Sequence, residues 1–445
     1  MDIGLVGLAV MGENLVLNIR DKGYTVSVYN RTYSKTEDFV KRSGVPGYKN
    51  LIDFIQSLKR PRKIILMVKS GMPVDIFLEQ LKEHLTNEDI VIDCGNSNFK
   101  DTIMRISKYK EYFHFAGAGV SGGEEGARHG PSIMVGSNAY VWNNLKDIFC
   151  SIAAKSDDGS CCRLMGPDGA GHFVKMVHNG IEYGMMQMIS EIYMIMAQYK
   201  TNEEISKIFE QWDKGICKGY LIEICNKIFK SKDDKYVIDE IDDKAEQKGT
   251  GSWCSILSLE TGQYLPIITA SVYARIISSK KELREKYSSL FHSNRENNEE
   301  IIKSLESAYY CGMICCYYEG LTFIRSISDL YSWNINLKEV IMAWKGGCII
   351  RTQYLNVLKN MNLNEEPFKD FIELVKEHIY DLRKVIIYSV QQEIPTPALS
   401  ASISFLDGLK TKKSGANLLQ AMRDFFGAHM VTRNGGDKEH LNWDR

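Results

Sequence analysis

Short apolar runs alternate with helical patterns through the first third of the chain. Ile3–Val6 and Ile90–Ile92 are continuous and apolar, as in strands that are buried on both faces of a sheet. Stretches whose apolar residues recur at helical spacing, such as Met11–Lys22 and Val74–His84, lie between such runs. This alternation predicts a mostly parallel sheet with right-handed helical crossovers. Further strands are predicted at Thr25–Tyr29, Ile64–Val68 and Phe113–Ala116.

The pattern changes at Met165–Gly169, where glycine and proline interrupt it. A long helical stretch follows to about Tyr199, and helical periodicity dominates from Thr201 onward, with no visible internal repeat at a fixed period. From Ala421 the chain becomes polar, and we expect a tail to leave the body there. The sequence therefore predicts an α/β domain, a large all-α domain and a short C-terminal tail.

Composition narrows the class of protein. The 445 residues are enough for about three domains. With 55 Lys+Arg against 56 Asp+Glu the net charge is −1, which argues against a general affinity for nucleic acid, because that affinity needs a basic surface. The 11 cysteines, scattered from Cys94 to Cys348, include no Cys-x-x-Cys pair. We expect reduced, buried thiols and neither a disulfide framework nor a metal site.

The sequence predicts neither a signal peptide nor a membrane segment. The most apolar helical candidate, Gly184–Tyr199, contains Gln187 and Glu191 and is shorter than a membrane span. We therefore expect a cytoplasmic protein.

Gly7–Gly12, with the sequence Gly-Leu-Ala-Val-Met-Gly, stands between the first predicted strand and the first predicted helix. Gly7 permits a tight turn, small Ala9 lets a pyrophosphate approach the backbone, and Gly12 permits close packing of helix on strand. The helix N-terminus adds N–H groups and the positive end of its dipole. Because alanine replaces the middle glycine of the usual pattern, an ordinary strand-to-helix turn is the alternative. The place of the loop in a strand–helix unit favours a dinucleotide site.

Asn30, Arg31 and Thr32 follow the second predicted strand. A site that prefers NAD usually carries an acidic residue here, which binds the ribose hydroxyls. Asn30 is neutral, and the Arg31 guanidinium can pair with a 2′-phosphate and stack on adenine. The segment favours NADP, against the alternative of a surface arginine.

Five polar residues, Lys175, His178, Asn179, Glu182 and Tyr183, recur at helical spacing and share one face of a predicted helix that is otherwise apolar. A solvated face is usually rich in Glu and Lys, without His, Asn and Tyr together. We call this set the polar stripe. It favours the wall of an active site over an internal polar network. The stripe offers a possible general base and a possible general acid, and burial or a nearby cation can bring a lysine pKa toward 7.

Two further loops and two arginines are candidate anion-binding groups. The glycine-dense segment Gly119–Gly126 can present hydroxyl and N–H groups to an oxyanion, and Gln247–Gly251 offers a lysine and a threonine before a predicted helix. Arg275 and Arg423 are candidate phosphate clamps. Taken alone, a plain turn explains each loop equally well, and a surface salt bridge is the commoner role of such an arginine.

These motifs follow one another along almost the whole chain. Because of the motifs and their order, the chain resembles the decarboxylating 6-phosphogluconate dehydrogenase family. The run Gly171–Tyr183 is the most specific of them. The other matching motifs are Gly7–Gly12, Asn30–Thr32, Val68–Ser70, Gly95–Ser97, Gly119–Gly130, Gln247–Gly251, Trp344–Arg351 and Arg423–His429.

The resemblance implies a Rossmann-like NADP-binding domain at residues 1–168, an all-helical substrate and dimerisation domain at 169–420, and a tail at 421–445 that reaches the partner subunit. It implies oxidative decarboxylation of 6-phospho-D-gluconate to D-ribulose 5-phosphate and CO2, with NADP reduced to NADPH. In this chemistry Lys175 takes the proton of the C3 hydroxyl, and Glu182 later protonates C1 of the enediol. No metal is required.

The resemblance also implies the contacts of each ligand. His178 and Asn179 complete the catalytic group. The expected cofactor contacts are Gly7, Leu8, Ala9, Val10, Met11, Gly12, Asn30, Arg31, Thr32, Val68, Lys69, Ser70 and Asn96. The expected substrate contacts are Asn96, Ser121, Gly122, Gly123, His178, Asn179, Tyr183, Lys248, Thr250, Arg275, Arg423 and His429. In the family the last two come from the partner subunit, which implies an obligate homodimer.

Three features depart from the family pattern. Met185 stands where aspartate is usual, Val135-Gly136-Ser137 replaces a stretch richer in glycine and proline, and the tail beyond His429 is short. A β-hydroxyacid dehydrogenase of the hydroxyisobutyrate type is one alternative, although such enzymes lack the phosphate residues around Lys248 and Arg423. A non-catalytic NADP-binding dimer is another, and the intact polar stripe argues against it.

Overall fold

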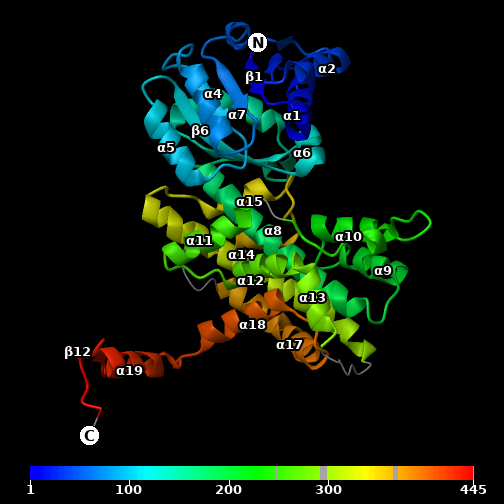
Figure 1. Cartoon of the computed structure of the whole chain (residues 1–445), viewed down its shortest axis with the longest axis vertical. Helices are drawn as coiled ribbons and strands as arrows, with labels where there is room; N and C mark the ends of the chain where they lie inside the picture. Colours follow the sequence, from blue (N-terminus) through cyan, green and yellow to red (C-terminus); the bar gives the residue numbers. More distant parts are fainter. Residues whose placement is uncertain (247–248, 291–297, 364–368, 444–445) are drawn as a thin grey trace.

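The computed structural model describes residues 1–246, 249–290, 298–363 and 369–443. Within them the chain forms an α/β domain, a body of helices and a projecting C-terminal segment (Figure 1). This is the fold class that the sequence predicts. The α/β domain ends with strand β10 (Cys162–Gly166), and the first long helix of the body, α8 (Ala170–Met196), begins four residues later.

In the described part of the chain, the N-terminal domain holds an eight-stranded sheet of order β10-β7-β6-β5-β4-β1-β2-β3. Neighbouring strands are parallel except for β6 and β7. The order reverses between β1 and β4, and a ligand crevice is expected where the carboxyl ends of these strands diverge. The other strands of the sheet are β1 (Ile3–Val6), β2 (Val26–Tyr29), β3 (Gly47–Tyr48), β4 (Lys63–Leu66), β5 (Ile90–Asp93), β6 (His114–Ser121) and β7 (Ser132–Gly136). The helices of the domain are α1 (Val10–Asp21), α2 (Tyr33–Ser43), α3 (Leu51–Gln56), α4 (Met72–Lys82), α5 (Phe99–Tyr109), α6 (Gly123–His129) and α7 (Ala139–Ile152), and a hairpin of β8 (Lys155–Ser156) and β9 (Gly159–Ser160) follows them.

Strand β6 is longer than the sequence predicts, because it continues through glycines at which helix α8 packs closely. The predicted strand stops at Ala116, because glycine usually weakens a strand. In the structure, a Cβ at Gly117 would lie 2.5 Å from Nδ1 of His172, and one at Gly119 would lie 2.2 Å from Cβ of Lys175. The glycines therefore let helix α8 lie directly on the strand. The residues on this face of α8 therefore contact the sheet directly.

The body is built from helices that follow α8 in sequence (Figure 1). Its elements are α9 (Asn202–Trp212), α10 (Tyr220–Lys230), the 3₁₀ turn η1 (Val237–Glu240), α11 (Thr250–Glu260), α12 (Pro266–Ser278), α13 (Lys281–Ser288), the 3₁₀ turn η2 (Glu299–Ile301), α14 (Ile302–Tyr331), α15 (Leu337–Trp344), α16 (Tyr354–Asn360), α17 (Lys369–Gln391) and α18 (Pro397–Lys410).

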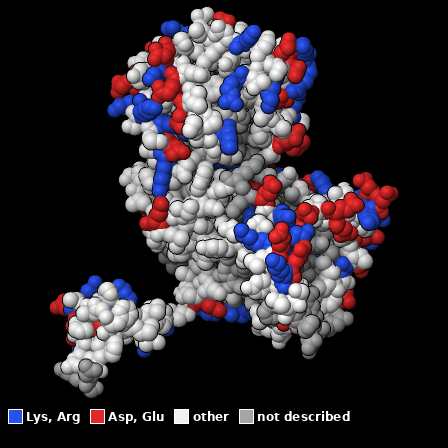
Figure 2. Space-filling model, in the orientation of Figure 1, with Lys and Arg blue, Asp and Glu red and all other residues white. Residues whose placement is uncertain are grey.

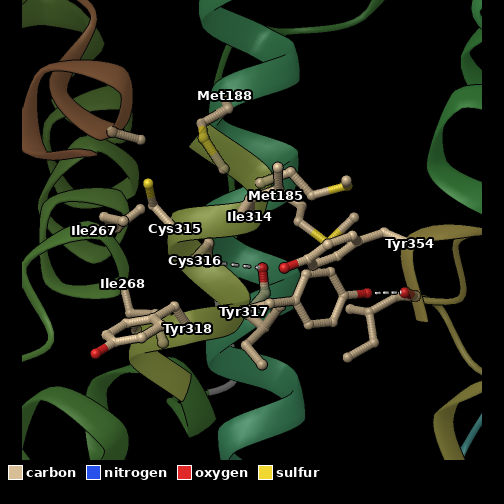
Figure 3. Close-up of a cluster of buried hydrophobic side chains, with 14 of the residues drawn as sticks. Met185, Met188, Ile267, Ile268, Ile314, Cys315, Cys316, Tyr317, Tyr318 and Tyr354 are labelled. Carbon is tan, nitrogen blue, oxygen red and sulfur yellow. Dashed lines mark hydrogen bonds between the residues drawn. The ribbon is translucent and has the colours of Figure 1, made fainter. Parts of the chain in front are cut away.

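Helices α8 and α14 form the centre of the body and contact each other closely (Figure 3). A Cβ at Gly184 on α8 would lie 2.4 Å from Sγ of Cys316 on α14, and a Cβ at Gly312 on α14 would lie 2.5 Å from Sδ of Met188 on α8. Each helix thus packs a sulfur-containing side chain onto a glycine of the other. Met185, which departs from the family pattern, is buried in this core.

Two buried glutamates extend this reciprocal arrangement. Glu191 on α8 accepts hydrogen bonds from two backbone N–H groups at the start of α18, with donor–acceptor distances of 2.8 and 3.0 Å. Glu319 on α14 accepts two from the start of α12, at 3.1 and 2.8 Å. Each glutamate follows its glycine, Gly184 or Gly312, by seven residues. Although the sequence shows no repeat of fixed period, the two central helices are therefore related by matching contacts.

The C-terminal segment projects away from the body (Figure 1). It contains α19 (Ala416–Gly427) and a hairpin of β11 (Val431–Thr432) and β12 (Lys438–Glu439). Residues 411–419 are exposed, so the chain leaves the body somewhat before the predicted start of the tail at 421. Within the described residues, no helix combines the length and the apolar character that a membrane crossing requires.

Candidate active site

The loop after β1 has the geometry of a dinucleotide turn. Gly7 has a φ of +106°, and a Cβ there would lie 2.3 Å from the carbonyl oxygen of Met67. A Cβ at Gly12 would lie 2.0 Å from the carbonyl oxygen of Gly7, so helix α1 can begin directly above the strand. No side chain caps the N-terminus of α1. Its first N–H groups therefore stay available to an anion.

The segment after β2 lies beside this loop. Oδ1 of Asn30 accepts a hydrogen bond of 3.1 Å from the backbone N–H of Leu8, which ties the two segments together. Arg31 and Thr32 are exposed, and among the described residues no carboxylate pairs with Arg31. A cavity of about 370 Å³ opens next to them and is lined by Leu8, Ala9, Val10, Glu13, Lys35, Asp38 and Arg42.

The other predicted cofactor residues follow neighbouring strands. Val68, Lys69 and Ser70 come just after β4, and Asn96 comes after β5. Because β5, β4 and β1 follow one another in the sheet and are all parallel, their carboxyl ends lie at the same edge as the dinucleotide turn. Buried Asp93 shapes the turn before Asn96 by accepting hydrogen bonds from the Gly95 N–H and the Ser97 hydroxyl. Asn96 itself is exposed.

The polar stripe forms one connected network on α8. Nζ of Lys175 donates a hydrogen bond to Oδ1 of Asn179 and lies 3.4 Å from Nδ1 of His178. Nδ1 of His178 lies 3.8 Å from a carboxylate oxygen of Glu182. The Asn179 amide donates to the Thr250 hydroxyl at 3.2 Å, so α11 joins the network. Lys175 and His178 are buried, and the Glu182 side chain retains 23% exposure.

Burial shifts the proton affinities of the stripe in opposite directions. It lowers the pKa of Lys175, because an ammonium is costly to remove from water. It raises the pKa of Glu182 for the corresponding reason, although the charges of Lys175 and Arg275 partly oppose this. It also lowers the pKa of His178 well below the ordinary value, and the Lys175 charge adds to that effect. The two shifts make the lysine amine a more available base and the glutamate carboxyl a more available acid, as a base and acid pair requires.

The glycine-dense loop meets the stripe from the α/β domain. The Ser121 hydroxyl lies 3.1 Å from Nε2 of His178. Gly122 and Gly123 have φ of +118° and +61°, and a Cβ at Gly122 would lie 2.5 Å from the carbonyl oxygen of Gly347 in the body. The loop therefore sits at the junction of the two parts of the chain. There its N–H groups and hydroxyl can face a ligand that lies against the stripe.

A second group of polar residues lies at the far end of the stripe. The guanidinium of Arg275 on α12 stacks on the ring of Tyr183, and Thr250 begins α11 beside Asn179. A Cβ at Gly251 would lie 2.6 Å from the Tyr183 ring, so three helices converge there. Lys248, predicted as a substrate contact, lies outside the described residues.

The structure does not bring Arg423 and His429 to this site. Both are exposed on the projecting segment, which Figure 1 shows well away from α8. Their participation requires the tail of another subunit.

Sequence reasoning gave no role to several residues beside the site. The indole ring of Trp344 lies edge-to-face with the His178 imidazole, with centroids 6.0 Å apart, and the buried Cys348 thiol lies near Lys175. Lys35, one turn after Arg31, adds positive charge to the cavity beside the dinucleotide turn. Its spacing of four residues from Arg31, at the start of a helix, was the available signal.

A dinucleotide turn in an α/β domain, together with a buried lysine and a partly buried glutamate on the helix that packs against that domain, defines the class of two-domain, nucleotide-dependent dehydrogenases. Comparison with known proteins identifies the family. Residues 2–166 match the NAD binding domain of 6-phosphogluconate dehydrogenase, and residues 171–443 match the 6-phosphogluconate dehydrogenase C-terminal domain. The chain belongs to the 6-phosphogluconate dehydrogenase family.

Individual relatives cover the full length. The chain is 45% identical to the NADP(+)-dependent, decarboxylating 6-phosphogluconate dehydrogenase of Bacillus subtilis, over 99% of this chain and 98% of the other. It is 43% identical to the decarboxylating 6-phosphogluconate dehydrogenase 1 of Saccharomyces cerevisiae, over 96% and 92%. A solved structure of Plasmodium falciparum 6-phosphogluconate dehydrogenase, studied in apo form and with NADP+ or 6-phosphogluconate, covers 100% of both chains with a TM-score of 0.95 at 39% identity.

Proposed function

We propose that this chain catalyses the oxidative decarboxylation of 6-phospho-D-gluconate to D-ribulose 5-phosphate and CO2, with reduction of NADP to NADPH. The observation that carries the proposal is the pairing on α8 of buried Lys175, whose pKa is lowered, with Glu182, whose pKa is raised. The relatives that share the whole chain length are decarboxylating 6-phosphogluconate dehydrogenases.

The cofactor site fits NADP. The uncapped N-terminus of α1 would offer N–H groups to the pyrophosphate, and exposed Arg31 and Thr32 would contact the 2′-phosphate of the adenosine. Val68, Lys69, Ser70 and Asn96 would line the nicotinamide end, at the same edge of the sheet as the dinucleotide turn. When bound, NADP accepts a hydride from C3 of the substrate.

The residues of the stripe would supply the proton transfers. Neutral Lys175 takes the proton of the C3 hydroxyl, and the resulting ammonium then polarises the C3 ketone so that the C1 carboxylate can leave as CO2. Glu182 donates a proton to C1 of the enediol that remains. Asn179 and His178 hold the lysine amine in place, and Ser121 holds His178 through its second ring nitrogen. A general acid or base of this kind contributes about 10²–10⁴ in rate.

The substrate phosphate would lie at the other end of the stripe, against Tyr183, Thr250 and Arg275. A homodimer would complete this end, because Arg423 and His429 are exposed on a segment that projects from the body.

Apolar side chains are also exposed, both on the projecting segment and on the body. They include Leu418, Leu419, Phe425 and Phe426 on the projecting segment, and Leu259, Tyr273, Ile277, Tyr380, Ile387 and Val390 on the body. Figure 2 shows few charged side chains on the middle of the body, whereas they are dense on the α/β domain. Such a surface is typical of a subunit interface.

All eleven cysteines are free thiols, which fits the cytoplasmic location that the sequence predicts. The domain limit at 168 is also part of the proposal, supported by the two matched family segments, which end and begin on either side of it, and by the short connection before α8. The limit at 420 stays a prediction.

The test is direct. Purified protein given 6-phosphogluconate and NADP should form NADPH and release an equal amount of CO2. Oxidation of 3-hydroxyisobutyrate without use of 6-phosphogluconate would instead support the hydroxyisobutyrate alternative, and absence of turnover with binding of NADP would support a non-catalytic dimer.

A further inference from the structure

Arg105 lies on α5, outside the residues proposed to contact a ligand, and its side chain is only 2% exposed. Its Nε and one terminal nitrogen donate to the two carboxylate oxygens of Asp75, at 2.8 and 3.1 Å. The same terminal nitrogen donates to the backbone carbonyl oxygen of Gly71 at 3.1 Å. Asp75 is in the first turn of α4, and Gly71 immediately precedes that helix. One edge of the guanidinium therefore holds both the start of α4 and the end of the loop before it.

The other terminal nitrogen of Arg105 lies toward the next loop of the sheet. It is 3.7 Å from a carboxylate oxygen of Asp93, which ends β5 and is fully buried. Asp93 in turn accepts hydrogen bonds from the Gly95 N–H, at 2.9 Å, and from the Ser97 hydroxyl. A buried carboxylate is costly without a countercharge and hydrogen bonds. Arg105 therefore supplies a countercharge to the carboxylate that shapes the second loop.

The two segments that Arg105 holds contain the four residues proposed to line the nicotinamide end of NADP. Residues 68–71 follow β4 and residues 94–97 follow β5, and we call these segments the cofactor loops. They contact each other directly, since a Cβ at Gly95 would lie 2.9 Å from the carbonyl oxygen of Val68. Because Arg105 contacts the end of one loop and the residue before the other, its side chain holds the two loops in one arrangement.

Helix α5 also contacts the helix that carries the proposed base. The hydroxyl of Thr102, one turn before Arg105, lies 2.7 Å from Nδ1 of His172, and both side chains are buried. His172 is one turn before Lys175 on α8. Consecutive turns of α5 thus hold the cofactor loops and the start of α8. Hydride transfer requires the nicotinamide and the substrate carbon to be in contact, so the geometry of α5 bears on that step.

We propose that Arg105 is a positioning residue for hydride transfer, which holds the cofactor loops so that the nicotinamide lies within reach of the substrate carbon beside Lys175. This rests on the proposed function, because it takes the cofactor loops as the nicotinamide site. Arg105 would touch neither ligand and would act through Gly71 and Asp93. Lysine does not replace it, since an ammonium lacks the planar fork that pairs with one carboxylate and reaches a second loop at the same time.

The experiment compares NADP with adenosine 2′,5′-bisphosphate, which has the 2′-phosphate but no nicotinamide. Titration calorimetry on full-length Arg105→Lys should show a dissociation constant for NADP raised about threefold to tenfold, as for the loss of one hydrogen bond, and an unchanged constant for the bisphosphate. The kcat with 6-phosphogluconate should fall about tenfold to a hundredfold, because a small misplacement of reacting groups can cost that much. A merely structural role would weaken both ligands alike.

Arg62→Lys is the matched control. Arg62 is a largely buried arginine of the same domain, and it pairs with buried Asp89 at 3.1 Å. These two residues precede β4 and β5, so they lie at the opposite edge of the sheet from the cofactor loops. Both dissociation constants and kcat should stay near the wild-type values. The proposal is overturned if the two variants have equal effects, if Arg105→Lys weakens the bisphosphate as much as NADP, or if its kcat is unchanged.

Asp75→Asn provides a second measurement if Arg105→Lys does not fold. The Asp75 side chain is 43% exposed, and asparagine keeps its shape but offers one acceptor oxygen to the guanidinium instead of two. NADP should bind about twofold to fivefold more weakly and the bisphosphate as before, and unchanged binding of NADP would overturn the proposal. Failure of the proposed function is a separate result, because the wild-type chain would then not turn over 6-phosphogluconate, whereas the binding comparison needs no turnover.

Discussion

The guanidinium carbon of Arg275 lies 3.5 Å from the centre of the Tyr183 ring. Gly251 also approaches this ring so closely that any side chain at position 251 would overlap it. One aromatic residue of the stripe therefore aligns α11 and α12 on α8. A guanidinium that stacks through its face keeps the N–H groups at its edge for phosphate oxygens.

Replacement of Arg275 by methionine should weaken binding of the substrate phosphate. A charge-assisted hydrogen bond contributes about 1.5–3 kcal/mol, so the KM for 6-phosphogluconate should rise by about tenfold to a hundredfold, with little change in the KM for NADP. Steady-state kinetics with each substrate varied in turn would measure both. Arg284→Met is the matched control, because Arg284 pairs with Asp243 on the surface. Equal rises for the two variants would argue against a phosphate contact.

Replacement of Lys175 by methionine should remove the base. We expect kcat to fall by about 10²–10⁴ or more, while NADP still binds, since the dinucleotide turn is untouched. Turnover and a direct binding measurement with NADP would show this. Lys303→Met provides the control, because Lys303 is an exposed lysine of the matching central helix α14. Near-wild-type activity of Lys175→Met would refute the assignment.

The rate should depend on pH through two limbs. Lys175 must be neutral to accept a proton, so activity should rise with pH through its lowered pKa. Glu182 must be protonated to donate, so activity should fall as pH rises through its raised pKa. A bell-shaped profile is expected. Glu182→Gln should be slower and should lose the alkaline limb, and an unchanged alkaline limb would show that another group causes it.

Removal of the Arg31 guanidinium should affect the two dinucleotides unequally. Arg31→Ala should raise the KM for NADP by about tenfold or more and leave that for NAD nearly unchanged, because only NADP carries the 2′-phosphate. Lys41→Ala, which removes another exposed cation of α2, serves as the control. A similar effect on both cofactors would contradict the assigned contact.

Two variants that are each inactive should regain activity when they are combined in one dimer, if the tail of one subunit completes the site of the other. Lys175→Met lacks the base but keeps its tail, and Arg423→Ala keeps the base but lacks the tail guanidinium. A mixed dimer purified through two different tags would contain one intact site only if Arg423 crosses to the other subunit. Activity in the mixed dimer well above that of either parent is expected. No gain over the parents would place Arg423 outside the other subunit's site.

Much of the fold follows from local patterns, and the exceptions are instructive. Strands such as β1 and β5 are continuous apolar runs, and helical spacing places the polar stripe on one face of α8. Strand β7 was missed because Gly130 and Pro131 suggest a loop immediately before it, and β3 because it has only two residues. Patterns of neighbouring residues also carry no information about the packing of α8 against α14, since that contact joins positions far apart in sequence.

Some features of the site also follow from local patterns, and others depend on tertiary packing. Spacing alone predicts that Lys175, Asn179 and Glu182 share a face. The approach of Ser121 to His178, and of Arg275 to Tyr183, depends on how separate elements pack, and only the family resemblance anticipates it. Trp344 ends α15 and Cys348 follows it in the next turn, and neither has a chemical signal in the sequence that would place it beside the stripe.

The contacts of Glu191 and Glu319 link the two halves of the body to each other. Each carboxyl holds the first turn of a helix that belongs, by matching position, to the opposite half of the body. A fragment that ended before α18 would leave Glu191 in an apolar interior without its backbone donors, which is costly. A chain cut before α18 should therefore be less stable than the full chain, and the helix that carries the proposed catalytic lysine should gain its full packing only when α18 is present.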